Sequence, residues 1–88
     1  MQLAVHGRRD GKNGQIVAEA EIDLHDASRV MAYRWYLGGR KRKYVMACTS
    51  TGTILLHRLI LDAKVGQRVG HSNGDPLDNR QCNLILLP

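Results

Sequence analysis

Three side chains in the last third of the chain, one imidazole and two carboxamides, have types and spacing that could carry chemistry. Asn79 follows His71 by eight residues, and Asn83 follows Asn79 by four. A neutral imidazole near pH 7 is a suitable general base, and a carboxamide oxygen is a hard donor that suits Mg²⁺. On a helix that begins near Asp78, positions 79 and 83 share one face. We therefore expect both carboxamides to face His71.

The elements that must position these side chains follow from hydrophobic alternation and turn residues. Residues 3–6 and 15–21 predict a hairpin, because apolar and polar residues alternate over 15–21. Asp23 stands where a helix N-cap would, with Asp26 three residues later, and predicts a helix over residues 24–33. The remaining predicted elements are strands at 35–37, 44–48 and 53–56, a helix at 57–62, an extended segment at 65–73, a closing helix at 78–84 and an apolar anchor at 85–87.

Length and composition limit the class of protein. The 88 residues predict a single domain, and 43% of them are hydrophobic. No segment approaches the roughly 20 apolar residues of a membrane span, and the first residues do not resemble a signal peptide. We therefore expect a cytoplasmic protein without membrane contact. Cys48 and Cys82 form no CxxC pair, which predicts neither a disulfide framework nor a structural zinc site.

Positive charge is concentrated in one part of the sequence. Thirteen lysines and arginines exceed eight acidic residues, for a net charge of +5. Residues 29–43 hold six basic residues and no acidic one, which favours a polyanionic partner, nucleic acid first. The basic run at 40–43 lies in a predicted turn. This turn either contacts the DNA backbone or is a solvated loop. Arg58 is a phosphate contact or a salt-bridge partner. The candidate nucleic-acid contacts are Arg34, Arg40, Lys41, Arg42, Lys43, Arg58 and Arg80.

The stretch from Leu56 to Pro88 carries three short motifs in register, LHRLIL, HSNGDPLDNR and NL. Together they resemble the HNH nuclease family, in particular the ββα-metal branch found in phage and intron-type homing endonucleases. The resemblance extends over residues 15–88 and is strongest over 56–84. It implies an α+β fold, in which a small β-rich part with a short helix at residues 1–53 precedes an HNH-like ββα module at residues 54–88.

The resemblance also implies roles for individual residues. His71 matches the general base that activates a water to attack the scissile phosphate, and Asn79 matches the residue that orients this base. Asn83 matches a ligand of a single divalent metal, typically Mg²⁺, which stabilises the leaving oxygen. Without the motif, His71 would be interpreted as a turn histidine that bonds its own loop. His57 is expected to be structural, with its ring bonded to a backbone carbonyl near the site.

One position departs from the family pattern. The family usually places an aspartate, an anionic metal ligand, directly before the histidine, and this chain has Gly70 there. We therefore expect an HNH-like protein that binds double-stranded DNA and in which metal-dependent nicking is weakened or lost, with weak Mg²⁺ binding or none. The alternative is a catalytically inactive interaction protein, such as a phage-encoded inhibitor of a nucleoprotein complex. Both interpretations allow a homodimer, and both place the protein in a phage-infected or bacterial cell.

Overall fold

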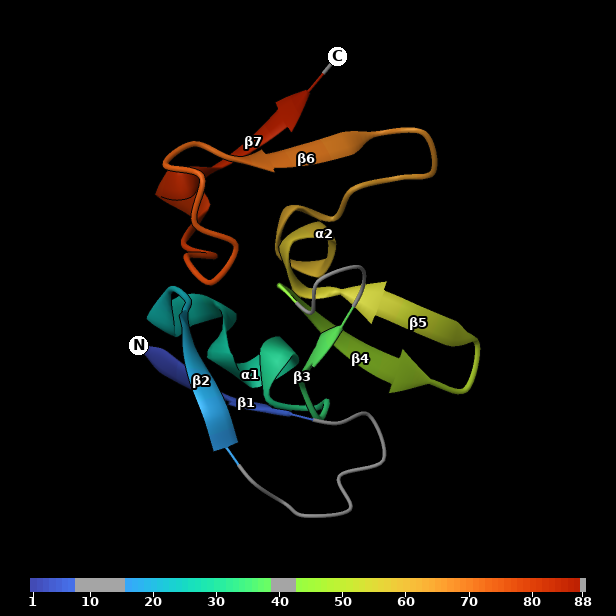
Figure 1. Cartoon of the computed structure of the whole chain (residues 1–88). Helices are drawn as coiled ribbons and strands as arrows, with labels where there is room; N and C mark the ends of the chain where they lie inside the picture. Colours follow the sequence, from blue (N-terminus) through green and yellow to red (C-terminus); the bar gives the residue numbers. More distant parts are fainter. Residues whose placement is uncertain (8–15, 39–42, 88) are drawn as a thin grey trace.

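The computed structural model describes residues 1–7, 16–38 and 43–87, and its α+β architecture consists mostly of strands (Figure 1). In chain order the elements are β1 (Gln2–His6), β2 (Ile16–Glu21), η1 (Leu24–Asp26), α1 (Ala27–Val30), β3 (Tyr36–Gly38), β4 (Tyr44–Thr49), β5 (Gly52–Leu55), α2 (Leu56–Leu61), β6 (Arg68–His71), η3 (Gln81–Asn83) and β7 (Leu84–Leu87). Five strands form one sheet in the order β2-β1-β3-β4-β5, and β6 pairs with β7 in a second sheet. The predicted α+β class is confirmed.

A parallel contact joins the two halves of the larger sheet. The predicted hairpin is confirmed, because β1 and β2 pair in antiparallel register. Strand β1 also runs parallel to β3, with His6 opposite Tyr36, and the His6 N–H donates to the Trp35 carbonyl at 2.9 Å. Strands β3, β4 and β5 then follow as an antiparallel meander. The hairpin and the meander are therefore one sheet, and β5 crosses the expected border between residues 53 and 54.

The hydrophobic core is formed by alternate residues of the sheet together with residues of α1 and α2. Trp35 is its largest fully buried side chain, and the indole N–H donates to the Val30 carbonyl at 2.7 Å. This bond satisfies the polar atom of the indole, so its apolar surface can be buried without an unpaired donor. The buried core residues are Leu3, Val5, Ala20, Ile22, Val30, Trp35, Val45, Ala47, Leu56, Ile60 and Leu84.

The first helical segment is shorter than the predicted helix at 24–33. It consists of η1 and α1 and ends at Val30. The chain then turns toward the sheet, because the Val30 carbonyl accepts the indole N–H of Trp35 and the backbone N–H of Tyr33. The Asp23 side chain makes no cap bond, and its Oδ2 accepts the backbone N–H of Gln81 at 2.7 Å. A contact between distant parts of the chain replaces the predicted capping.

The closing helix predicted at 78–84 is wrong. Arg80 is extended, with φ −70° and ψ 143°, and only residues 81–83 form a short 3₁₀ turn. The preceding segment lies against β2 instead. The Glu21 N–H donates to the Leu77 carbonyl at 2.7 Å, and the Asn79 N–H donates to the Glu21 carbonyl at 2.8 Å. Backbone groups that a helix would bond internally are thus satisfied by the large sheet.

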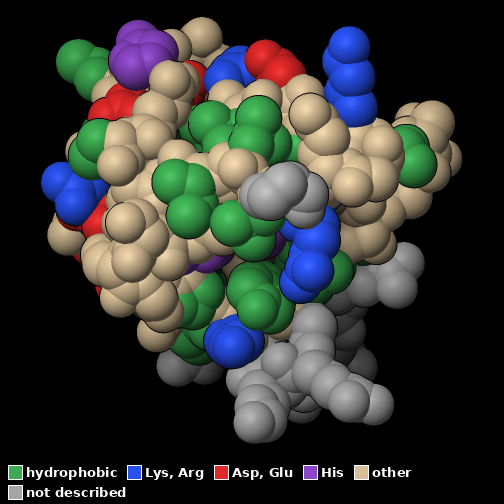
Figure 2. All heavy atoms as spheres, turned by 90° about the horizontal axis from the view of Figure 1, so that it is seen from above, with side chains coloured by type: hydrophobic (Ala, Val, Ile, Leu, Met, Phe, Trp, Pro, Cys, Tyr) green, Lys and Arg blue, Asp and Glu red, His purple; other side chains and the backbone are tan. Residues whose placement is uncertain are grey.

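Residues 85–87, which we expected to form an apolar anchor, belong to strand β7 (Leu84–Leu87). Strand β7 pairs antiparallel with β6, which places His71 opposite Leu84. Leu84 is buried, but the side chains of Ile85, Leu86 and Leu87 are 45%, 50% and 38% exposed. Figure 2 looks down on this end of the molecule and shows hydrophobic side chains at its surface.

Two further features bear on the class of protein. In the described ranges, every helix is too short or too polar to cross a membrane. Cys48 and Cys82 are exposed free thiols, as expected for a chain without a disulfide framework.

Candidate functional site

His71 and Asn79 form the hydrogen bond that the motif predicts. The Nε2 atom of His71, at the end of β6, lies 3.0 Å from Oδ1 of Asn79. The Asn79 Nδ2 donates to the Pro76 carbonyl at 3.1 Å, so its Oδ1 is the atom that faces the imidazole and accepts. His71 must therefore carry its proton on Nε2 when it is neutral. This tautomer leaves the lone pair on Nδ1.

Strand β2 holds Asn79 in place. The Asn79 side chain is fully buried, and its backbone N–H bonds to the carbonyl of Glu21. A parallel bridge between Glu21 and Asp78 fixes the same segment. The expected interaction between the two motif residues thus depends on the large sheet rather than on a shared helix face.

The loop between His71 and Asp78 is stabilised by its own polar side chains. The Asn73 Oδ1 accepts the backbone N–H of Asp75 at 2.9 Å, and the Asp75 Oδ1 accepts that of Leu77 at 3.0 Å. The Gly74 N–H donates to the His71 carbonyl at 2.9 Å, and Gly74 has φ +76°, which glycine adopts without steric cost. The sequence Asn-Gly-Asp-Pro is thus a turn directly after the base candidate.

Asn83 bonds this loop with both ends of its carboxamide. Its Oδ1 accepts the Asn73 N–H at 3.1 Å, and its Nδ2 donates to Asn73 Oδ1 at 3.0 Å and to the Asp78 carbonyl at 2.9 Å. The side chain is 6% exposed. The oxygen proposed as a metal ligand therefore already accepts a backbone hydrogen bond inside the loop.

Arg80 is paired with an acidic residue. Its Nε and Nη2 donate to the two carboxylate oxygens of Asp78 at 2.8 and 2.7 Å. The hydrogen bond from Arg80 lowers the pKa of Asp78 to about 2, although burial of the carboxylate acts in the opposite direction. The arginine predicted to contact DNA thus neutralises a buried carboxylate beside the loop, and its side chain is 47% exposed.

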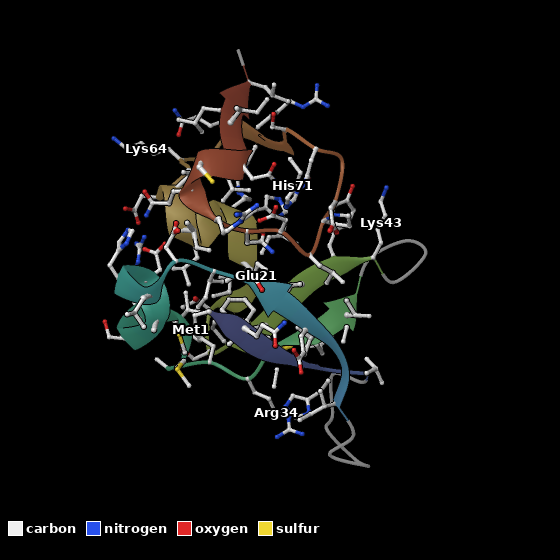
Figure 3. All side chains as sticks on the ribbon, turned by 90° about the vertical axis from the view of Figure 1, so that its left-hand side faces the viewer. Met1, Glu21, Arg34, Lys43, Lys64 and His71 are labelled. Carbon is white, nitrogen blue, oxygen red and sulfur yellow. The ribbon has the colours of Figure 1, made fainter. Side chains whose placement is uncertain are left out.

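The other predicted basic residues lie in different places. Arg58 donates to the carbonyls of Lys64 (2.8 Å) and Gln67, so it fastens the segment before β6. Arg34 lies 3.4 Å from His6 Nδ1, and Figure 3 shows it at the opposite end of the molecule from His71. The other predicted contacts, Arg40, Lys41 and Arg42, lie outside the described residues.

Lys43 is the predicted basic residue that the fold brings to His71. Both line a pocket of about 210 Å³, and Figure 3 shows them on the same side of the molecule. The Lys43 Nζ lies 5.2 Å from the centre of the Tyr44 ring. The remaining lining residues are Tyr44, Val69, Gly70, Gly74 and Pro76. A larger pocket of about 580 Å³ lies between β5 and α2 and contains neither His71 nor Asn79.

His57 is a second imidazole at the site. It is the second residue of α2 and is 7% exposed, and its ring centroid lies 5.1 Å from that of His71. Burial, and then the nearby His71 and Arg58, lower the pKa of His57 to about 4. Among the described residues the expected bond from its ring to a backbone carbonyl is not made, and the ring lies beside that of Tyr44, with 5.9 Å between the ring centroids. The apolar spacing of LHRLIL indicates that His57 lies on a buried face, but it does not predict that the ring lies beside that of His71.

The residues around His71 do not fit the expected Mg²⁺ ion. Mg²⁺ prefers carboxylate and water oxygens, and none of the described residues that line the pocket has a carboxylate. A group that could hold a metal lies elsewhere in the described part of the chain, where ligand atoms of Asp23, His25 and Asp26 fall within 4.8 Å of one another. Gln81 already donates to Asp26 at 3.0 and 3.1 Å and, through its backbone, to Asp23.

The site thus combines an oriented imidazole, a lysine and glycine backbone, with no acid among the described residues that line the pocket. Comparison with family models, with curated proteins and with solved structures finds no match to this chain. The functional argument therefore rests on the residues and their contacts.

Proposed function

We propose that this chain is an HNH-like DNA-binding protein in which metal-dependent nicking is lost or strongly weakened. The observation that carries the proposal is the hydrogen bond between His71 Nε2 and Asn79 Oδ1, beside Lys43 in a pocket that no acid of the described ranges lines. The bond preserves the orientation that a general base requires. The lining is complementary to a phosphate rather than to a bare divalent cation.

The charges support a phosphate as the group that enters the pocket. Lys43 makes no ion pair among the described residues, so its charge is available to a ligand. The backbone of Gly70 and Gly74 lines the same pocket, and glycine allows close approach. The net charge of +5 adds long-range attraction to a polyanion. Together these features favour contact with the DNA backbone rather than base-specific recognition.

The missing acid explains why we propose binding without efficient cleavage. A neutral His71 could still accept a proton at Nδ1. The charge that develops on the leaving oxygen needs a metal ion or an equivalent cation for stabilisation. Position 70 offers no ligand, and the carboxamide of Asn83 is bonded to the loop. The chain therefore keeps the base, and neither position 70 nor Asn83 is available to hold Mg²⁺.

Binding is tested with a fluorescently labelled duplex and fluorescence anisotropy at several salt concentrations. Lys43→Gln should weaken binding and reduce the slope of log affinity against log salt by about one, because one phosphate contact is removed. Lys64→Gln removes a lysine that does not line the pocket and is the matched control. Equal effects of the two substitutions would show that this pocket is not where DNA binds.

Cleavage is tested with supercoiled plasmid in Mg²⁺ or Mn²⁺. We expect no nicking by the native chain and nicking by Gly70→Asp. A Cβ atom at position 70 would lie 3.4 Å from Leu87 and 3.5 Å from Ile85, which are ordinary contacts. The double variant with His71→Ala should be inactive again. Nicking by the native chain that His71→Ala abolishes would contradict the proposed loss of cleavage.

The exposed surface of β7 favours a second function, that of a catalytically inactive interaction protein. Ile85, Leu86 and Leu87 are partly exposed, and in the described part of the chain β7 pairs only with β6. Exposed apolar strands with a free edge mark protein contacts or aggregation-prone sites. If the native chain binds no duplex in the anisotropy experiment, this function replaces the first. Leu86→Lys should then abolish association with the partner, whereas Lys43→Gln should not.

A further inference from the structure

We propose that His57 and His71 form a binding site for a late first-row transition-metal ion, for which Zn²⁺ is the representative. The site differs from the expected Mg²⁺ site in its ligands, because it uses two imidazoles and does not use Asn83. It goes beyond the proposed DNA contact, since it requires no nucleic acid.

The separation of the two rings fits a shared ion. Their centroids are 5.1 Å apart and their planes are inclined by 69°. Two imidazoles bound to one tetrahedral Zn²⁺, at Zn–N distances of about 2.0–2.1 Å, have ring centroids about 5 Å apart. The two side chains come from different elements, α2 and β6, so their separation is a consequence of the tertiary fold.

Each ring keeps a nitrogen that bonds no group in residues 1–7, 16–38 and 43–87. His71 bonds Asn79 through Nε2, which leaves Nδ1. His57 is more than nine-tenths buried, and its ring makes no hydrogen bond within the described residues. Every fully buried side-chain nitrogen or oxygen in these ranges has a partner. The unbonded ring nitrogens of His57 are therefore not fully enclosed by the described residues.

The bond between His71 and Asn79 also suits a metal ligand. Ligating histidines commonly donate their second N–H to an oxygen acceptor, which fixes the ring orientation. Asn79 provides such an acceptor at 3.0 Å and is itself fully buried. Nitrogen donors without carboxylates favour Zn²⁺, Ni²⁺, Co²⁺ or Cu²⁺ over Mg²⁺. Two protein ligands leave the other positions to water or to an anion in the pocket.

The cluster of Asp23, His25 and Asp26 is the competing site in the described residues. The side chain of Arg29 donates to Asp26 at 3.1 Å, and Gln81 donates to the same carboxylate. An ion there would have to displace these donors, whereas the free ring nitrogens of His57 and His71 require no displacement. The two sites contain different histidines, so substitutions separate them.

The experiment is a calorimetric titration of the full chain with Zn²⁺ in the absence of DNA, with Mg²⁺ as the comparison ion. We expect binding of one Zn²⁺ and no detectable binding of Mg²⁺. His57→Gln and His71→Gln should each lower the Zn²⁺ affinity by at least about tenfold. His25→Gln and His6→Gln are the matched controls and should leave the affinity unchanged. Circular dichroism confirms that each variant is folded.

Three results would overturn the proposal: no binding of Zn²⁺ by the native chain, loss of binding in His25→Gln, or full binding by His71→Gln. If His57→Gln does not fold, NMR of the native chain replaces it. Zn²⁺ must then shift the ring resonances of both His57 and His71, and a shift confined to other histidines refutes the site. Failure of DNA binding has no bearing on these outcomes, and failure of Zn²⁺ binding leaves the proposed DNA contact intact.

Discussion

The five-stranded sheet and the segment from Arg68 to Leu87 are held together by different kinds of contact. The sheet buries apolar side chains such as Val5, Ile22 and Trp35, which are at most 1% exposed. The second segment buries polar groups, including Asp78, Asn79 and Asn83, each satisfied by hydrogen bonds. Only Leu84 of this segment belongs to the buried core cluster.

The difference indicates how each region responds to change. Apolar packing is non-directional, so the sheet loses free energy in proportion to the volume removed. A buried polar network depends on geometry, and removing one member leaves its partners without hydrogen bonds. We therefore expect substitutions in the sheet to unfold the whole chain, and substitutions in the polar segment to open it locally.

The largest effect is expected for Trp35→Ala. It removes the largest fully buried side chain and the donor to the Val30 carbonyl. The free energy of unfolding should fall by about 4 kcal/mol, a large part of the total for a domain of this size. Urea denaturation followed by circular dichroism measures it. Met31→Ala, at a side chain 60% exposed in the same segment, should change stability by less than about 0.5 kcal/mol.

The second prediction concerns His57, which lies on α2 and contacts the polar segment through His71. Its pKa is lowered from 6.5 to about 4 in the folded state, so between these values the unfolded chain binds a proton that the folded chain does not. Stability should therefore fall as the pH decreases from about 6.5 to about 4, by roughly 2 to 3 kcal/mol in total. Urea denaturation across this range measures the slope.

His57→Gln is the control for this pH dependence. The variant lacks the titrating group, so its stability should fall less than that of the native chain between pH 6.5 and 4. Asp78 contributes at lower pH, because its pKa is lowered from 3.8 to about 2 and its contribution is lost only as the pH falls through that interval. A native chain whose stability is flat from pH 6.5 to 4 would contradict the burial of His57 as a neutral ring.

The same difference explains which elements the sequence could predict. The strand at 15–21 was predictable because its alternation of apolar and polar residues reflects one more buried face. The strand at 44–48 has apolar residues throughout, and its alternation is visible only in the structure, where Val45 and Ala47 are buried. The helix in LHRLIL was predictable from its apolar spacing. In residues 15–21 and in LHRLIL, the order of residue types along the chain indicates which side chains are buried. The parallel pairing of His6 with Tyr36 leaves no such pattern in the sequence. This pairing joins the hairpin of β1 and β2 to the meander of β3, β4 and β5 in one sheet.

The errors occur where polar side chains bond distant partners. Asp23 has the type and position of a helix cap, but it accepts the backbone N–H of Gln81, which is 58 residues away. Asp78 and Asn79 look like the start of a helix, but their segment pairs with Glu21 of β2. The interaction of His71 with Asn79 was predicted correctly for a reason that was wrong, since no helix face presents Asn79. Local propensity was overridden by tertiary hydrogen bonds in each case.

The third and smallest effect is expected for Asn83→Ala. The substitution removes three hydrogen bonds and leaves the Asn73 N–H and the Asp78 carbonyl without their partner. The free energy of unfolding should fall by about 2 kcal/mol. Hydrogen exchange should locate the loss, with faster exchange of the Asn73 amide. The His6 amide, which donates to Trp35 in the large sheet, should change only as much as global stability does.

Gln67→Ala is the matched control for this last prediction, because it removes a carboxamide whose single hydrogen bond, from the Lys64 N–H, is exposed to solvent. Water can replace that bond, so its stability should change by less than about 0.5 kcal/mol. Equal exchange of the Asn73 and His6 amides in Asn83→Ala would mean that the two regions unfold only together. The polar segment would then unfold cooperatively with the apolar core. The two regions would differ in the residues that they bury but not in the free energy of their opening.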